Sequence, residues 1–172
     1  MTLERDIEQL TKTLLNISSV QVPRATSAAI NKTTAKAKTR IIRGVSKSKA
    51  LPQKIIRKKL FVKRSTAKKQ RSRLSSYRNA VSVMSLKAKQ NKKGVRAQGG
   101  RFYQGAFIAK GVGGNLRVFK RESGSRYPIK HMVVNIKDTV DNVMPTVIRR
   151  VVKQDYERLL KHELDFRLGK YQ

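Results

Sequence analysis

Cysteine and tryptophan are absent from this chain of 172 residues, and aromatic residues make up only 6% of it. Without cysteine there is no disulfide framework and no thiolate zinc site, so folding must depend on burial of apolar side chains or on assembly. No apolar run approaches the length of a membrane span, and the first residues lack the apolar segment of a signal peptide. We therefore expect a protein of a cytoplasm or a particle, with no membrane partner.

Acidic residues are missing from the whole stretch between Gln9 and Arg121. That stretch carries 30 of the 41 lysine and arginine residues, and the formal net charge of the chain is +31. So much positive charge would repel itself in an isolated compact protein, so we expect a polyanionic partner, with nucleic acid as the first candidate. A solvated surface would explain any single basic run equally well, but it explains poorly so long a stretch without one acid.

Apolar spacing predicts helices at both ends of the chain. The stripe Leu3, Ile7, Leu10, Leu14 and Ile17 predicts a helix from residue 2 to about 18. It is too short for a free coiled coil, so we expect it to pack on this chain or on a neighbouring subunit. A long C-terminal helix should begin near residue 138 and end at Gly169. Pro145 either kinks this helix or marks its true first turn.

Two proline residues mark further helix starts. A basic amphipathic helix is predicted to begin at Pro23, with cations away from its apolar face. A short helix is predicted from Pro52 through Leu60, with enough apolar residues to dock it.

The middle of the chain predicts a small sheet. A partly alternating pattern over 74–86 suits a half-buried strand, residues 106–110 and 116–121 should form a hairpin, and a fourth strand is expected at 129–134. The glycines and cations of 91–104 indicate a mobile basic loop. The fold class is therefore α+β in a single domain over 1–172: basic helices (1–64), a mainly antiparallel sheet of about four strands (73–135) and the C-terminal helix (138–168).

Candidate catalytic and metal-binding groups are few. Asp138 and Asp141 form the only close carboxylate pair near the sheet, and their place in a first helical turn favours stabilisation of the helix end. His131, expected in a strand, and His162, expected on a helix surface, lie far apart in sequence and have no thiolate companions. The glycine-rich segments lack the phosphate-loop and dinucleotide patterns. We predict no catalytic residue, no metal and no cofactor.

Because no base-reading motif is present, we expect salt-sensitive contact with a phosphate backbone through many lysine and arginine side chains. The composition would equally suit a structural RNA-binding protein of ribosomal type. A nuclease would need clustered carboxylates, which the acid-free stretch does not provide.

Four segments, in this order, resemble the phage minor tail protein Z family. They are residues 28–33 followed by a train of cations, 51–57, 105–109 and the block 118–129. The most specific are the Gly-Ala-Phe-Ile-Ala strand and the block that leads from Phe-Lys-Arg to Arg-Tyr-Pro-Ile. Family members often have leucine where this chain has Tyr127. The resemblance runs from about Ala28 to the C-terminal helix.

The resemblance implies a non-enzymatic tail completion protein of lambda-like phages, added at the head-proximal end of the tail for head–tail joining and DNA positioning or passage. The implied partners are the tail terminator, tail tube and neck proteins, genomic double-stranded DNA, and further copies in a ring, with a hexamer expected from tail symmetry. The implied location is the virion, after assembly in the host cytoplasm. A structural RNA-binding protein is the main alternative.

Within that role, we expect basic residues that face the lumen to contact DNA and the terminal helices to contact other subunits. The candidate DNA-contact residues are Lys54, Arg57, Lys58, Lys59, Lys92, Lys93, Arg96 and Arg101. The candidate interface residues are Leu3, Ile7, Leu10 and Leu14.

Overall fold

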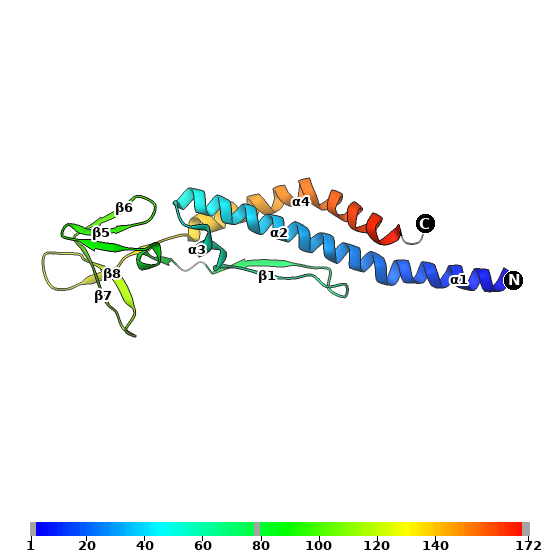
Figure 1. Cartoon of the computed structure of the whole chain (residues 1–172), viewed down its shortest axis with the longest axis horizontal. Helices are drawn as coiled ribbons and strands as arrows, with labels where there is room; N and C mark the ends of the chain where they lie inside the picture. The colour runs from blue at the N-terminus through cyan, green and yellow to red at the C-terminus, as the bar shows by residue number, and fades with distance from the viewer. Residues whose placement is uncertain (1–2, 78–79, 170–172) are drawn as a thin grey trace. The chain divides into compact units, whose positions relative to one another are not determined.

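The computed structural model describes residues 3–77 and 80–169 (Figure 1). Its contacts divide the chain into two compact units. The first unit contains residues up to Arg40, residues 61–75 and residues from Met144 onward, and the second contains residues 41–60 and 76–143. The elements are helices and small antiparallel sheets, which confirms the predicted α+β class.

The N-terminal helices are almost continuous. Helix α1 (Leu3–Asn16) passes through a π-helical turn, η1 (Ile17–Gln21), into α2 (Val22–Lys49) (Figure 1). Both predicted helices are confirmed over the described residues, with residue 2 of the first lying outside them, and the residues between the two helices are helical as well. Within the first unit, α2 buries a row of small residues that includes Ala25, Ala29 and Ala37. Residues spaced by four lie on one face of a helix, so this row faces the unit's interior while the cations point away from it.

Helix α4 (Lys137–Leu168) is the predicted long C-terminal helix. Pro145 lies inside it, and Gly169 follows its end, where the Gly169 N–H donates to the carbonyl oxygen of Asp165 at 2.9 Å. The helix carries two buried acids in the first unit, Asp155 (6% exposed) and Glu163 (5% exposed). A buried carboxylate is costly unless it is paired, so these two acids need cationic partners.

The partners come mainly from the basic face of α2. Asp155 pairs with Lys36 Nζ at 2.9 Å and with Arg40 Nη2 at 3.3 Å. Glu163 pairs with Lys32 of α2 and with Arg167 of α4 itself. Three cations of the acid-free stretch therefore hold two helices of the first unit together.

These pairs give the stability of the first unit a defined pH dependence. Hydrogen bonding from Lys36 holds the pKa of Asp155 below its ordinary value, against the opposing effect of burial. Burial alone would raise the pKa of Glu163, but hydrogen bonds from Lys32 and Arg167 outweigh it and lower that pKa. Both carboxyl groups therefore bind protons more weakly in the folded chain than in the unfolded chain.

We expect the thermal unfolding temperature to change little from pH 7 to about 5 and to fall below about pH 4.5, where the unfolded chain takes up protons that the folded chain does not. The double variant Asp155→Asn, Glu163→Gln should unfold at a lower temperature at pH 7 and decline less steeply in acid. The control Glu157→Gln, which removes an exposed acid from the same helix, should keep the wild-type profile. An equally steep acid decline in the double variant would contradict this account.

Residues 60–76 form a hairpin that the sequence did not indicate. The predicted short helix is confirmed only over α3 (Gln53–Arg57), and its extension to Leu60 was wrong, because Leu60 begins strand β1 (Leu60–Lys63). Strand β1 pairs with β2 (Arg73–Ser76). The β-forming residues of β1 are few and stand between cations, so the alternating pattern of a strand was too short to recognise.

The second unit contains small sheets packed around a short 3₁₀ turn. The single strand predicted over 74–86 was wrong, because this segment holds β2, the two-residue strand β3 and the turn η2 (Val83–Leu86). The hairpin predicted at 106–110 and 116–121 is confirmed residue for residue. The fourth strand predicted at 129–134 is divided into two short strands. The strands of this unit are β3 (Val81–Ser82), β4 (Lys89–Asn91), β5 (Gly94–Ala97), β6 (Arg101–Gln104), β7 (Ala106–Lys110), β8 (Leu116–Arg121), β9 (Ile129–His131) and β10 (Val133–Val134).

The predicted mobile loop at 91–104 was also wrong. Strands β4, β5 and β6 form an antiparallel three-stranded sheet. The glycines lie at its turns, with φ of +81° at Gly99 and +70° at Gly100, values that glycine adopts at no steric cost. Cations occupy exposed positions of the strands, so the sequence has the polarity of a loop while its buried positions, such as Val95, are those of a strand.

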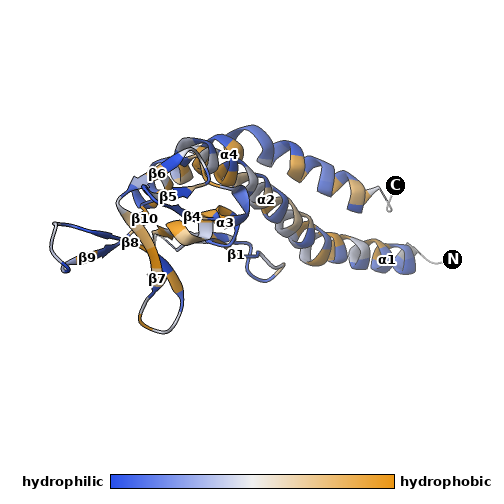
Figure 2. Cartoon of the chain, turned by 60° about the vertical axis from the view of Figure 1, so that its left-hand side comes forward, coloured by the Kyte–Doolittle hydropathy of each residue, from blue (hydrophilic) through white to orange (hydrophobic). Residues whose placement is uncertain are grey.

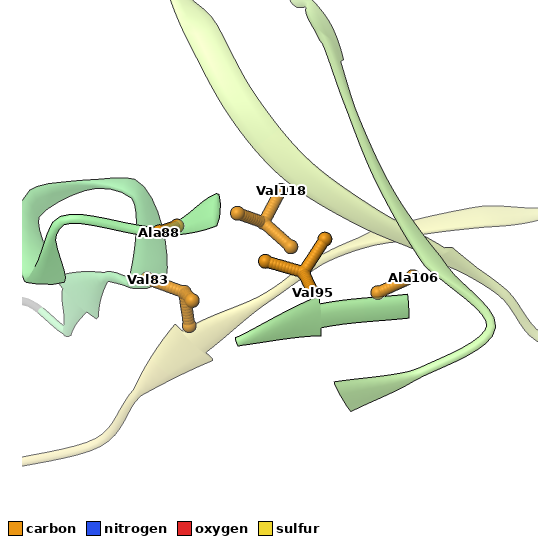
Figure 3. Close-up of a cluster of buried hydrophobic side chains, with 5 residues drawn as sticks. All are labelled: Val83, Ala88, Val95, Ala106 and Val118. Carbon is orange, nitrogen blue, oxygen red and sulfur yellow. The ribbon is translucent and has the colours of Figure 1, made fainter. Parts of the chain in front are cut away.

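A small cluster of buried side chains holds these sheets together (Figure 3). Val83 comes from η2, Val95 from β5, Ala106 from β7 and Val118 from β8, and Ala88 precedes β4. The side chains are short and only five residues are buried in the cluster, so the core is small, which fits a chain with only 38% hydrophobic residues.

Candidate nucleic-acid interface

The first predicted basic cluster surrounds a groove in the second unit. Lys54 lies in α3, and Lys58 and Lys59 follow it directly. Buried Ile56 fixes the inner face of this short helix, so its lysines face outward. Arg57 is exposed on the same helix but does not line the groove.

The groove has a volume of about 640 Å³, and hydroxyl groups lie among its lining residues together with the lysines. The polar residues that line it are Lys54, Lys58, Lys59, Tyr77, Ser82 and Ser85. Ammonium and hydroxyl donors around one groove suit the oxygen atoms of a phosphate group. The groove can therefore bind an anion of phosphate type.

His131 lies in strand β9, as predicted. It contacts Ser82, which is one of the residues that line this groove. Its Nε2 and the Ser82 Oγ are 3.2 Å apart. Burial lowers the pKa of His131, and the neighbouring Arg117 lowers it further. The lowered pKa favours the neutral imidazole, which serves as a hydrogen-bonding partner of Ser82.

The second predicted cluster belongs to the sheet β4–β5–β6. Lys92 and Lys93 form the turn between β4 and β5, and both are exposed. Arg96 of β5 stands opposite Lys89 on one side and Phe102 on the other, so these three side chains share one face of the sheet. The Arg96 guanidinium lies 5.8 Å from the centre of the Phe102 ring. This face presents cations around an exposed aromatic ring.

Arg101 has a different environment from the rest of its predicted cluster. Its Nη1 donates to the carbonyl oxygens of Ala50 at 3.1 Å and Gln98 at 2.9 Å, and its Nη2 donates to Lys49 O. A guanidinium at the C-terminus of a helix satisfies carbonyl groups that the helix leaves unpaired. Arg101 therefore anchors β6 to the end of α2, and its guanidinium is engaged by backbone carbonyl groups of its own unit.

The chain also has a third basic surface, in the first unit, that the sequence prediction missed. A groove of about 240 Å³ lies in the segment that connects β1 and β2, and it is lined by Lys63, Arg64, Thr66, Lys69, Arg71 and Arg73. The signal was present, since six of the eleven residues from 63 to 73 are lysine or arginine. The sequence alone did not mark it as a site, because its cations alternate with small polar residues and no regular apolar spacing indicates a hairpin there.

The predicted interface stripe of α1 is solvent-exposed. Ile7 is 55% exposed, Leu10 60% and Leu14 57%, and the side chain of Leu3 lies outside the described residues. Hydrophobic residues recur among hydrophilic ones along this helix (Figure 2). Aligned apolar side chains with this exposure mark a surface available to another protein.

The described residues offer little support for other kinds of site. Within 3–77 and 80–169, no group of three or more histidine, cysteine, aspartate or glutamate residues is placed to hold a metal ion. In the same part of the chain, no helix has both the length and the apolar composition needed to cross a membrane. Asp138 lies in the first turn of α4, and His162 is exposed on that helix, as predicted.

Comparisons with known proteins give a consistent result. A family described as "Prophage minor tail protein Z (GPZ)" matches residues 3–172. The tail completion protein of Escherichia phage N15 is 27% identical over 162 residues, which is 88% of this chain and 88% of that protein. The tail completion protein Z of Escherichia phage lambda is 27% identical over 184 residues, covering 96% of this chain and 92% of that protein. No solved structure matches the chain.

Proposed function

Because this chain belongs to the prophage minor tail protein Z family, we propose that it completes a phage tail at the end that joins the head. Family membership makes it a structural tail protein and a component of the virion, and it confirms the resemblance seen in the sequence. Two relatives named for tail completion match it over most of both chains, which supports the more specific role.

We further propose that the protein contacts the genomic double-stranded DNA in that position. The observation that carries this proposal is the display of exposed cations on two surfaces of the second unit, the groove beside α3 and the sheet β4–β5–β6. Neither surface needs base-specific contacts to bind, because attraction to phosphate is independent of sequence. A component that holds DNA of any sequence at the tail entrance requires this kind of contact.

Assembly into a ring is the third part of the proposal. A ring around the DNA path would bring the basic surfaces of several copies to one lumen, and six-fold tail symmetry makes a hexamer the expected form. The exposed α1 stripe supplies an apolar surface for contact between copies. The tail terminator, tail tube and neck proteins are the partners that this position implies.

The proposal is tested first by the location of the protein in the particle. Gold-labelled antibody on intact virions and on separated tails should mark the head-proximal end of the tail. Recovery of the protein with ribosomes, and no label on any particle, would instead favour a structural RNA-binding protein.

A second readout on the same virions tests the contact with DNA. Chemical crosslinking followed by mapping of the crosslinked peptides should yield DNA adducts on 54–59 or on 92–96. Label at the tail end without any adduct to DNA would leave the structural role and remove the DNA contact.

A further inference from the structure

We propose that residues 63–73, which run from the last residue of β1 to the first residue of β2 and are here called the basic hairpin, form a preformed binding site for the phosphate backbone of duplex DNA. This basic hairpin was absent from the contact residues predicted by the sequence, and it lies in the first unit, whereas both predicted clusters lie in the second. The inference rests on the proposed function, because that function places the protein in contact with duplex DNA.

The cations of the basic hairpin are available for a ligand. The six are Lys63, Arg64, Lys68, Lys69, Arg71 and Arg73. Within the described residues, none of them takes part in an ion pair with an acid of the chain.

The α2 cations of the same unit are a clear contrast. Lys32, Lys36 and Arg40 are paired with the two buried acids of α4, so their charge serves the packing of helices. The structure thus separates the basic residues of the first unit into paired ones and ones whose charge faces solvent.

The basic hairpin is held in one conformation by its polar residues. The Asn31 side chain of α2 forms two hydrogen bonds with the backbone of Ser65, in which Asn31 Nδ2 donates to Ser65 O at 2.9 Å and Ser65 N donates to Asn31 Oδ1 at 2.9 Å. Ser65 is only 4% exposed, and its Oγ donates to the carbonyl oxygen of Lys69 at 3.1 Å. The two bonds from Asn31 fix the start of the loop on a rigid helix.

Further hydrogen bonds close the loop on itself. Thr66 N donates to Lys69 O at 3.0 Å, and Lys69 N donates back to Thr66 Oγ1 at 3.1 Å. Ser72 Oγ donates to Lys63 O at 3.0 Å at the base of the hairpin. A loop ordered in advance loses less conformational entropy on binding, so its cations bind phosphate more tightly than those of a flexible tail would.

The form of the site indicates the ligand. Five cations surround a groove of about 240 Å³ whose remaining lining residue is Thr66, a hydroxyl donor. Arginine and lysine around a hydroxyl are the usual donors to phosphate oxygens, and among the described residues no apolar or aromatic side chain lines the groove to stack a base. The site therefore fits the backbone of a duplex better than an unpaired strand.

The test measures binding of the full-length protein to a short duplex DNA between about 50 and 200 mM salt. In the triple variant Arg64→Gln, Lys69→Gln, Arg71→Gln, the affinity should depend less steeply on salt. The magnitude of the slope of log affinity against log salt should fall by about 2 to 3, since each lost phosphate contact reduces it by about 0.9. The matched control Arg24→Gln, Arg149→Gln, Arg150→Gln removes the same charge from exposed helical positions of the same unit and should lower the slope by less than about 1.

The variant Asn31→Ala tests the preformed conformation separately, because it keeps every charge. It should bind the duplex several-fold more weakly than the wild type at a temperature where circular dichroism shows both to be folded. Equal affinity would overturn the role of the Asn31–Ser65 hydrogen bonds in binding.

The outcomes separate this inference from the function on which it rests. If the wild type bound the duplex strongly but the slope of log affinity against log salt changed equally in the hairpin variant and in the matched control, the hairpin site alone would be overturned. Absence of duplex binding by the wild type would overturn both the hairpin site and the proposed DNA contact, whereas gold label at the tail end would still support the structural role. Tighter binding of an RNA duplex of equal length would also overturn the inference.

Discussion

Replacement of Gly94 by alanine should destabilise the second unit by more than about 3 kcal/mol, an effect large enough to prevent folding of a marginally stable protein. Gly94 begins β5 with φ of +151°, a conformation that other residues rarely adopt. A Cβ atom at this position would overlap the carbonyl oxygen of Tyr103 and lie 3.1 Å from Gln104 Cα. Both neighbours are backbone of β6, so the overlap is relieved only by breaking the pairing of the two strands.

Urea denaturation followed by circular dichroism measures this effect, and Gly100→Ala is its matched control. Gly100 lies in the turn between β5 and β6 with φ of +70°, and a Cβ atom there would meet nothing within 4 Å. The control therefore carries only the left-handed backbone strain, about 1 to 2 kcal/mol. If the two variants lost the same stability, the collision with β6 would not be the cause.

The elements that the sequence predicted correctly are those with long or regular signals. The helices were found because their apolar residues recur at the helical period over several turns, and the β7–β8 hairpin because strand-forming residues flank the glycine-rich turn at 111–114. The sheet β4–β5–β6 was missed for a physical reason. Its strands are short and expose one face to solvent, so cations such as Lys89 and Arg96 occupy positions on that face and conceal the alternation.

The roles of individual cations could not be predicted from the sequence. Lys36 and Lys58 both stand in basic segments without a nearby acid, yet Lys36 is paired with Asp155, which lies far away in the chain. Arg101 looked like a member of a basic loop, whereas its guanidinium satisfies carbonyl groups at the end of α2. Charge density in the sequence shows how much basic surface exists, and tertiary contacts decide which of it remains for a ligand.

The triple variant Ile7→Gln, Leu10→Gln, Leu14→Gln should strongly weaken assembly of the proposed ring while leaving the subunit folded. Each of these side chains is more than half exposed, so their replacement by a good helix former changes the stability of the free subunit by less than about 1 kcal/mol. Covering them in an interface would stabilise it by about 1 kcal/mol each, because roughly half the burial of a large apolar side chain remains to be gained. Their loss should weaken association by about 100-fold at each contact.

Analytical ultracentrifugation over a range of protein concentrations measures the association, and complementation of a phage that lacks the gene measures its consequence for infectivity. The control Arg5→Gln, Lys12→Gln changes exposed residues at positions opposite the stripe and should leave both readouts near the wild-type level. Unchanged assembly in the triple variant would mean that the copies meet through another surface. Normal assembly with lost infectivity would instead mean that the stripe contacts a different tail protein. An apolar surface that is not covered by a second copy still requires a partner.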